Sequence, residues 1–173
     1  MSEKLVYLGG TITPNPIHLK WREHVASKLD LLFIQCINPV RGKNPADWDN
    51  NGFDANEGVV YSKGGFVERD LRDVKRSDLI FCNFSEPLDR QSIGTWWELG
   101  WADMLGKPIV IVSKLPEVIN HPFVWKRVAR VCFTLDEGIE YTRFLLEACA
   151  PNARTLFQCR NATPDSMVGR GTF

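Results

Sequence analysis

Short apolar runs alternate with amphipathic stretches along most of the chain. Runs of strand length stand at Leu5–Leu8, Phe33–Ile37, Leu79–Phe84, Ile109–Val112 and Val131–Phe133. Helical periodicity is found at 16–30, 65–76 and 94–106. Pro122 is expected to open a short helix, because proline suits the first helical position, and the capping box Thr134–Glu137 predicts a last helix ending near Cys149.

Strands that alternate with helices favour right-handed crossovers between parallel strands. The predicted fold class is therefore α/β, a doubly wound five-stranded parallel sheet with helices on both faces. Such sheets bind ligands beyond the carboxyl ends of their strands. We therefore expect a site among the segment after Leu8, Asn38–Lys43, 85–93 and 113–121.

One domain is expected over residues 1–150, because no linker or repeat divides this part of the chain. Residues 41–64 are rich in Asn, Asp and Gly and predict a long loop, and such loops are more often functional than incidental. The C-terminal tail, 151–173, lacks clear periodicity, so its structure stays uncertain.

Charge and composition exclude several classes of protein. The 21 basic residues balance the 21 acidic ones, which argues against nucleic-acid binding through bulk charge. No apolar run approaches the roughly 18 residues of a membrane span, and the N-terminus lacks the apolar segment of a signal peptide. Five cysteines without CxxC spacing and three dispersed histidines indicate reduced thiols, a cytoplasmic location, and neither metal nor cofactor.

The first candidate site follows the first strand. Gly9 and Gly10 let the backbone approach a ligand, and Thr11 adds a hydroxyl. The segment is not a dinucleotide fingerprint, because it lacks the GxGxxG spacing. A plain strand-to-helix turn remains an equal alternative.

The second candidate is the segment Ser92–Gly100, at the start of a predicted helix. Exposed amides and hydroxyls there favour an anion, and Glu98 is expected in the first turn. The spacing of Thr95 and Glu98 also fits a capping box, and local spacing alone favours that structural interpretation. The apolar neighbours Trp96 and Trp97 argue for a functional carboxylate, since apolar surroundings disfavour an idle charge.

Other charged and aromatic residues have plainer interpretations. Most acids around Asp70 are expected on a solvated helix face, and Asp73 is interpreted as surface charge. Arg22 and Arg41 could bind phosphate, although lone arginines seldom do. Trp97 and Trp101 share a helix face, and core packing is expected for them rather than base stacking.

An ordered set of segments resembles the nucleoside 2-deoxyribosyltransferase family. The matching segments are Val6–Thr11, Arg69–Leu71, Ser77–Ile80, Ser92–Ala102 and Gly106–Pro108. They follow the family's order and span roughly residues 5–135. The resemblance implies a flavodoxin-like sheet and an enzyme that cleaves the N-glycosidic bond of deoxynucleosides without a cofactor.

Residue by residue, the resemblance implies three catalytic roles. Glu98 matches the nucleophile that attacks the anomeric carbon, Asp70 the acid that handles the proton on the base, and Tyr7 the tyrosine that orients the nucleophile. A covalent sugar ester divides one hard step into two. Attack by a second base then gives transfer, and attack by water gives hydrolysis. Substrate-binding residues are expected at Gly9, Gly10, Thr11, Ser92, Gly94, Asn120 and His121.

One departure concerns the 5′ end of the substrate. The transferases often carry an aspartate six residues before the nucleophile, where this chain has Ser92. The chain is similar here to the related 2′-deoxynucleoside 5′-monophosphate N-hydrolases, and Thr11 matches a phosphate-contacting hydroxyl in them. In such relatives a neighbouring subunit often completes the site. The resemblance therefore implies a homodimer or higher oligomer, with Asn120 and His121 in the contributing segment.

Two other functions remain open from sequence. The chain could be a non-catalytic nucleotide-binding module, although Tyr7, Asp70 and Glu98 occur together. It could also be an unrelated flavodoxin-like regulator in which Glu98 is a helix cap. The sequence does not distinguish transferase from hydrolase, free nucleoside from 5′-monophosphate, or deoxyribose from ribose.

Overall fold

The computed structural model describes residues 3–12, 17–41, 63–85 and 92–148. In chain order they form β1 (Lys4–Gly10), α1 (Ile17–Asp30), β2 (Ile34–Ile37), α2 (Lys63–Arg76), β3 (Leu79–Phe84), α3 (Ile93–Met104), β4 (Ile109–Ser113), α4 (Pro116–Ile119), α5 (Pro122–Arg127), β5 (Arg130–Cys132) and α6 (Leu135–Ala148).

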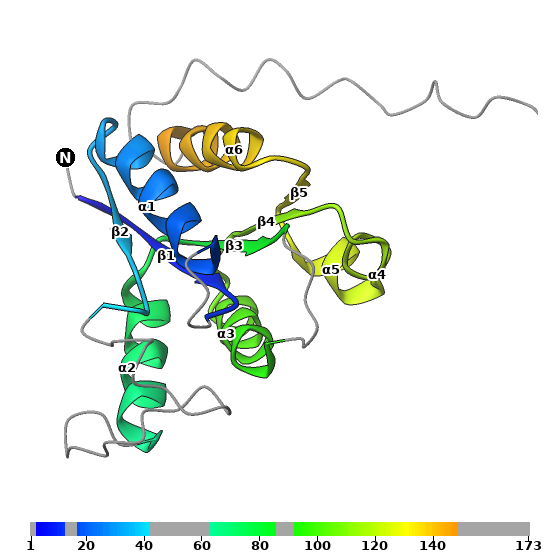
Figure 1. The fold of residues 1–173 in the computed structure, drawn as a ribbon, viewed down its shortest axis with the longest axis horizontal. Coiled ribbons are helices and arrows are strands. Elements are labelled where there is room, and N and C mark those ends of the chain that lie inside the picture. Colours follow the sequence, from blue (N-terminus) through cyan, green and yellow to red (C-terminus); the bar gives the residue numbers. More distant parts are fainter. Residues whose placement is uncertain (1–2, 13–16, 42–62, 86–91, 149–173) are drawn as a thin grey trace, which may run out of the picture.

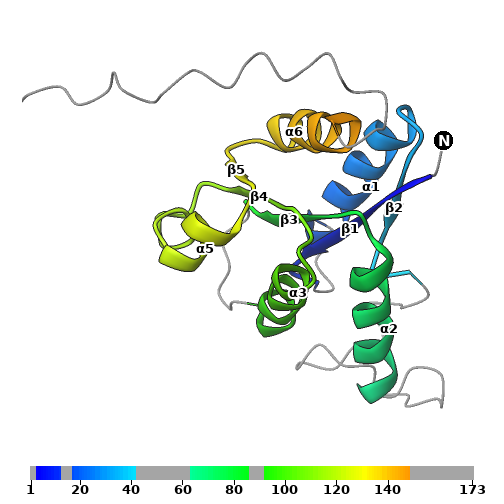
Figure 2. The same cartoon turned by 180° about the vertical axis from the view of Figure 1, so that it is seen from behind.

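All strand pairs are parallel, and the sheet has the order β2-β1-β3-β4-β5. This is the flavodoxin-like order, whose switch point lies between β1 and β3. Figure 1 shows α1 and α6 on one face of the sheet and α2 and α3 on the other, and Figure 2 shows the same arrangement from behind. The predicted fold class is confirmed.

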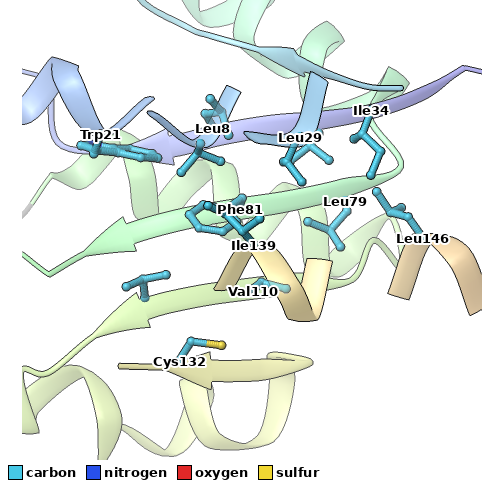
Figure 3. Close-up of a cluster of buried hydrophobic side chains, with 13 residues drawn as sticks. Leu8, Trp21, Leu29, Ile34, Leu79, Phe81, Val110, Cys132, Ile139 and Leu146 are labelled. Atoms are coloured by element: carbon cyan, nitrogen blue, oxygen red, sulfur yellow. The ribbon is translucent and has the colours of Figure 1, made fainter. Parts of the chain in front are cut away.

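Two apolar cores lie on opposite faces of the sheet. Val6 and Leu8 of β1 point into the core under α1 and α6, together with Leu29 and Phe81 (Figure 3). Tyr7, between them in sequence, points into the core under α2 and α3. The alternation along a strand therefore decides which helices each side chain meets.

Most predicted elements agree with the structure to within two residues, and β3 has the predicted bounds. The predicted capping box at the start of α6 forms around Thr134, whose Oγ1 accepts a hydrogen bond from the Glu137 amide at 3.2 Å. Helix α4 was missed, because Pro116–Ile119 is too short to show a period. The 42–62 part of the predicted loop and the tail lie outside the described residues.

Two predictions about packing are wrong. Trp97 is 63% exposed and so does not pack in the core. Its neighbour Trp101, whose ring centroid is 6.3 Å away, is partly buried against the core, as expected. Asp73 is buried rather than solvated, because Arg41 and Arg76 both pair with its carboxylate. In both cases the sequence did not indicate which side of the helix packs against the sheet.

The described cysteines, Cys36, Cys82 and Cys132, carry free thiols. None of the described helices is long and apolar enough to cross a membrane.

Candidate active site

A hydrogen bond between β1 and α3 lies at the centre of the candidate site. Tyr7 is fully buried, and its hydroxyl donates to Glu98 Oε1 at 2.8 Å. These residues are 91 positions apart in the chain, so only the fold brings them together. The predicted pairing of Tyr7 with Glu98 is found in the structure.

Gly9 lies beside the Glu98 carboxylate. A Cβ built at Gly9 would stand 3.5 Å from Glu98 Oε2 and 3.6 Å from Cys82 Sγ, which is ordinary van der Waals contact. Glu98 thus lies over the carboxyl end of β1, beside the switch point of the sheet.

Glu98 does not cap its helix. The cap of α3 is Ser92, whose side-chain oxygen accepts from the Thr95 amide at 3.3 Å and from Thr95 Oγ1 at 2.8 Å. Helix α3 begins at Ile93, which places Glu98 in the second turn rather than the expected first. The capping-box interpretation of Glu98 is therefore wrong.

Burial and nearby carboxylates keep Tyr7 protonated. Burial raises the pKa of the Tyr7 hydroxyl well above its usual value, and the negative charges of Glu98 and Asp70 raise it further. A neutral phenol is a hydrogen-bond donor to a carboxylate. Tyr7 can therefore hold Glu98 in one orientation throughout the neutral pH range.

Asp70 lies on α2 and is buried, not solvated as most acids in its segment were expected to be. Arg69 Nη2 contacts Asp70 Oδ1 at 3.3 Å and also donates to the Pro39 carbonyl at 2.7 Å. One turn further on, Asp73 joins Arg41 to the same helix. Ion pairs thus tie the end of β2 to α2 and fix the helix that carries Asp70.

Gly10 and Thr11 continue β1 toward the site. Gly10 has a φ of 144°, and a Cβ there would stand 2.9 Å from the Asn83 carbonyl oxygen, so glycine is required. Thr11 Oγ1 is buried, and it has no hydrogen-bond partner among the described residues. A buried hydroxyl of this kind is available to a ligand.

The other predicted binding residues lie around the start of α3. Gly94 is exposed, and open space surrounds the position of a Cβ there. Asn120 and His121 are exposed between α4 and α5. The His121 ring is 6.4 Å from the Trp96 ring of α3.

Sequence reasoning missed the role of Arg22 in this part of the fold. Arg22 is fully buried and donates to backbone carbonyls at the end of β1. A signal was present, because Arg22, Val25 and Leu29 follow the spacing of one apolar helix face. Within the described ranges, no group of three or more His, Cys, Asp or Glu side chains could hold a metal ion.

Solved structures of several kinds share this fold. The 2-deoxyribosyltransferase of Bacillus psychrosaccharolyticus is 21% identical, with a TM-score of 0.60 over 79% of this chain and 91% of that one. The CMP N-glycosidase of Clostridium botulinum is 18% identical, with a TM-score of 0.53 over 82% and 99%. A molybdenum cofactor binding protein of Rippkaea orientalis is 13% identical, with a TM-score of 0.59 over 84% and 99%.

At these identities the likenesses show the fold alone. Among curated proteins, no significant match was found. A family model described as "Nucleoside 2-deoxyribosyltransferase like" matches residues 3–115, which include Tyr7, Asp70 and Glu98. The chain therefore belongs to the nucleoside 2-deoxyribosyltransferase-like family.

Proposed function

We propose that this protein cleaves the N-glycosidic bond of a 2′-deoxynucleoside or its 5′-monophosphate through a covalent sugar–Glu98 intermediate. The observation that carries the proposal is the Tyr7–Glu98 hydrogen bond at the carboxyl edge of the sheet. Family membership supports the reaction class, since the matched segment contains the whole Tyr7–Asp70–Glu98 set. No cofactor is needed for this chemistry.

In the first step a Glu98 oxygen attacks the anomeric carbon, and the bond from that carbon to the base nitrogen breaks. The electron pair of that bond leaves with the base, which takes a proton from Asp70 or through it. Asp70 is buried on α2, and its carboxylate pairs with Arg69. A carboxyl group held in this way can exchange a proton with the departing base.

In the second step an acceptor attacks the anomeric carbon, and the Glu98 carboxylate leaves. A base as acceptor gives transfer, and water gives hydrolysis. Tyr7 contributes in both steps by donating to Oε1, which holds the carboxylate with Oε2 beside Gly9. A carboxylate fixed in this way loses little further freedom on reaching the transition state.

A panel of nucleosides and 5′-monophosphates, with and without an acceptor base, tests the proposal. We expect free base from at least one substrate, and an exchanged nucleoside or nucleotide if the enzyme is a transferase. Chromatography resolves both products. Absence of any base release across the panel, from folded protein, would contradict the proposal.

The 5′ end of the substrate is the second part of the proposal, and here we favour a phosphate. Ser92 caps α3, where backbone amides carry partial positive charge, and both of its described hydrogen bonds use Oγ as the acceptor. Its own proton can therefore be donated to an anion. The likeness to a CMP N-glycosidase agrees with a 5′-monophosphate substrate.

Ser92→Asp tests this preference, because the negative charge of the aspartate would repel the phosphate of the substrate. The wild-type protein should prefer the 5′-monophosphate over the free nucleoside by about tenfold or more in kcat/KM. The variant should lose or reverse that preference. Wild-type preference for the free nucleoside would instead favour the transferase reading.

A non-catalytic nucleotide-binding module is the second candidate. The likeness to a molybdenum cofactor binding protein favours it, because a shared fold alone does not imply catalysis. Such a module would bind nucleotides in a calorimeter and release no base. The substrate panel and a binding measurement on the same protein therefore separate the two functions.

We also propose that a second copy of the chain completes the site. Helix α5 exposes Phe123 and Trp125, each 75% accessible, next to His121. Large exposed aromatic side chains of this kind are typical of interfaces. Light scattering should show a dimer or larger, and Trp125→Glu should shift it toward monomer with loss of activity. A fully active monomer would contradict this part.

A further inference from the structure

Arg22 is a buried cation at the carboxyl end of β1. From α1 its Nη2 donates to the Gly10 carbonyl at 2.8 Å, and Nη1 and Nε reach the Thr11 and Leu8 carbonyls at 3.3 Å each. The guanidinium also lies 4.4 Å from the centre of the Trp21 ring. Three backbone carbonyl oxygens of residues 8–11 thus surround one positive charge.

The glycine pair separates this charge from Glu98. A Cβ at Gly9 would stand 3.5 Å from Glu98 Oε2, and a Cβ at Gly10 would stand 3.5 Å from Arg22 Nη2. Consecutive residues of a strand face opposite sides of the sheet. Glu98 therefore meets β1 from the α3 side and Arg22 from the α1 side.

The charges around Glu98 come from four elements. Tyr7 of β1 donates to Glu98, and Cys82 of β3 interacts electrostatically with it and with Arg22. From α2, the carboxylates of Asp70 and Asp73 act on Tyr7. Burial keeps the Tyr7 hydroxyl and the Cys82 thiol neutral, because it raises the pKa of both groups. Arg22 is a buried cation that interacts electrostatically with Glu98.

Arg22 stays charged at neutral pH. Burial lowers the pKa of its guanidinium to about 10, and the interactions with Cys82, Glu98 and Tyr7 oppose that shift. Electrostatic coupling is reciprocal, so the interaction that favours charged Arg22 equally favours the Glu98 carboxylate.

We propose that Arg22 is a positioning residue for the reaction: through the Gly9–Gly10 backbone it holds the end of β1 and keeps the Glu98 carboxylate ionised and oriented for attack. This inference rests on the proposed function of Glu98. Arg22 has no exposed surface, so it contacts no substrate and acts through Glu98. Substrate binding should depend on it little, and the chemical step should depend on it strongly.

Arg22→Gln tests the inference, because glutamine keeps hydrogen-bond donors and removes the charge. We expect kcat to fall with little change in KM. The acid limb of the kcat profile should move up by about one pH unit, which adds about a tenfold loss at the acid end. An acid limb at the wild-type pH in folded Arg22→Gln would overturn the proposal.

Val25→Ala is the matched control. It removes buried volume from the same face of α1, one turn further on, and alters no charge. It should lower the melting temperature and leave the acid limb where the wild type has it. A shift in both variants would show that the profile reports on general loosening of α1, and the proposal would fail.

If Arg22→Gln does not fold, Arg22→Lys carries the test. A buried lysine loses its proton at lower pH than a buried arginine. The proposal then requires a new fall of kcat on the alkaline side, where the wild type is still active. The proposal would be overturned if Arg22→Lys had the same kcat as the wild type and the same dependence of kcat on pH at the alkaline end.

Glu98→Ala, measured beside these variants, separates the two levels of the proposal. Full turnover by Glu98→Ala would remove the proposed function itself. Loss of turnover in Glu98→Ala with an unshifted profile in Arg22→Gln would remove only the role of Arg22.

Discussion

The two layers that cover the sheet bury different chemistry. The α1 and α6 layer packs an apolar core (Figure 3). Among the described residues of this layer, Arg22 is the buried charged side chain. The α2 and α3 layer buries the carboxylates Asp70 and Asp73 and the phenol of Tyr7, with Glu98 beside them. One layer is a scaffold, and the other carries the groups that can react.

The difference shows how a small domain places acids at the edge of a sheet without losing its core. Burying a charge is costly unless it is paired. Arg41 and Arg76 pair with Asp73, Arg69 pairs with Asp70, and Tyr7 donates to Glu98. Substitutions in the reactive layer should therefore affect turnover. Substitutions of the apolar side chains in the scaffold layer, which excludes Arg22, should affect stability.

Glu98→Ala should give the largest effect. Loss of a covalent nucleophile should raise the barrier by at least about 3 kcal/mol, on the order of a hundredfold or more in rate. The cost in stability should be about 1–3 kcal/mol or more, because the buried Tyr7 hydroxyl loses its acceptor. Turnover and melting temperature of the same variant check this, and near-wild-type turnover would remove Glu98 from the reaction.

Asp70→Asn should come next, and its effect should depend on the leaving base. A proton donor matters most when the base leaves poorly, so natural bases should lose about a hundredfold. A nitrophenyl leaving group needs no proton and should lose much less. Parallel rates with the two substrates check this, and equal losses would assign Asp70 a structural role.

Leu29→Ala probes the opposite layer. Leu29 of α1 is fully buried against the sheet, and removing its side chain should cost at least about 2 kcal/mol of unfolding free energy. At a temperature where the variant is folded, kcat should stay within about twofold of the wild type. Urea unfolding and kinetics measure the two quantities. A large fall in kcat for folded Leu29→Ala would show that the layers are not separable.

Among the three substitutions in the reactive layer, Tyr7→Phe should give the smallest fall in turnover. The substitution removes the donor to Glu98 Oε1 and keeps the buried ring. The activation free energy of turnover should therefore rise by roughly 1 to 3 kcal/mol. Because the raised pKa keeps Tyr7 protonated, its removal should not alter the alkaline limb of the pH profile below about pH 10. An altered limb in that range would mean that Tyr7 titrates during turnover.

The fold was predictable from sequence because its strands are continuous apolar runs. Leu79–Phe84 is such a run, bounded by Ser77-Asp78 and Ser85, and its predicted bounds agree with the structure. Buried parallel strands need apolar residues on both faces, so this signal is local. The short helix α4 carries too few residues for any period, and it was missed for that reason.

The site was predictable only in part. The family resemblance identified Tyr7 and Glu98, and their hydrogen bond is found in the structure. The burial of Asp73 depends on Arg41, which is distant in the chain, so no local pattern indicates it. The sequence likewise did not identify Ser92 as the cap of α3, because the spacing of Thr95 and Glu98 fits a capping box too.

The central claim is that Glu98 is the nucleophile, and mass spectrometry of the quenched enzyme tests it most directly. A 2-fluoro sugar substrate slows both steps by destabilising the positive charge on the sugar, and a reactive leaving group allows the first step to proceed. The account predicts a mass increase of one sugar unit on the peptide that contains Glu98, absent in Glu98→Gln. Stoichiometric release of base with an unmodified protein, or an adduct on another residue, would contradict the account.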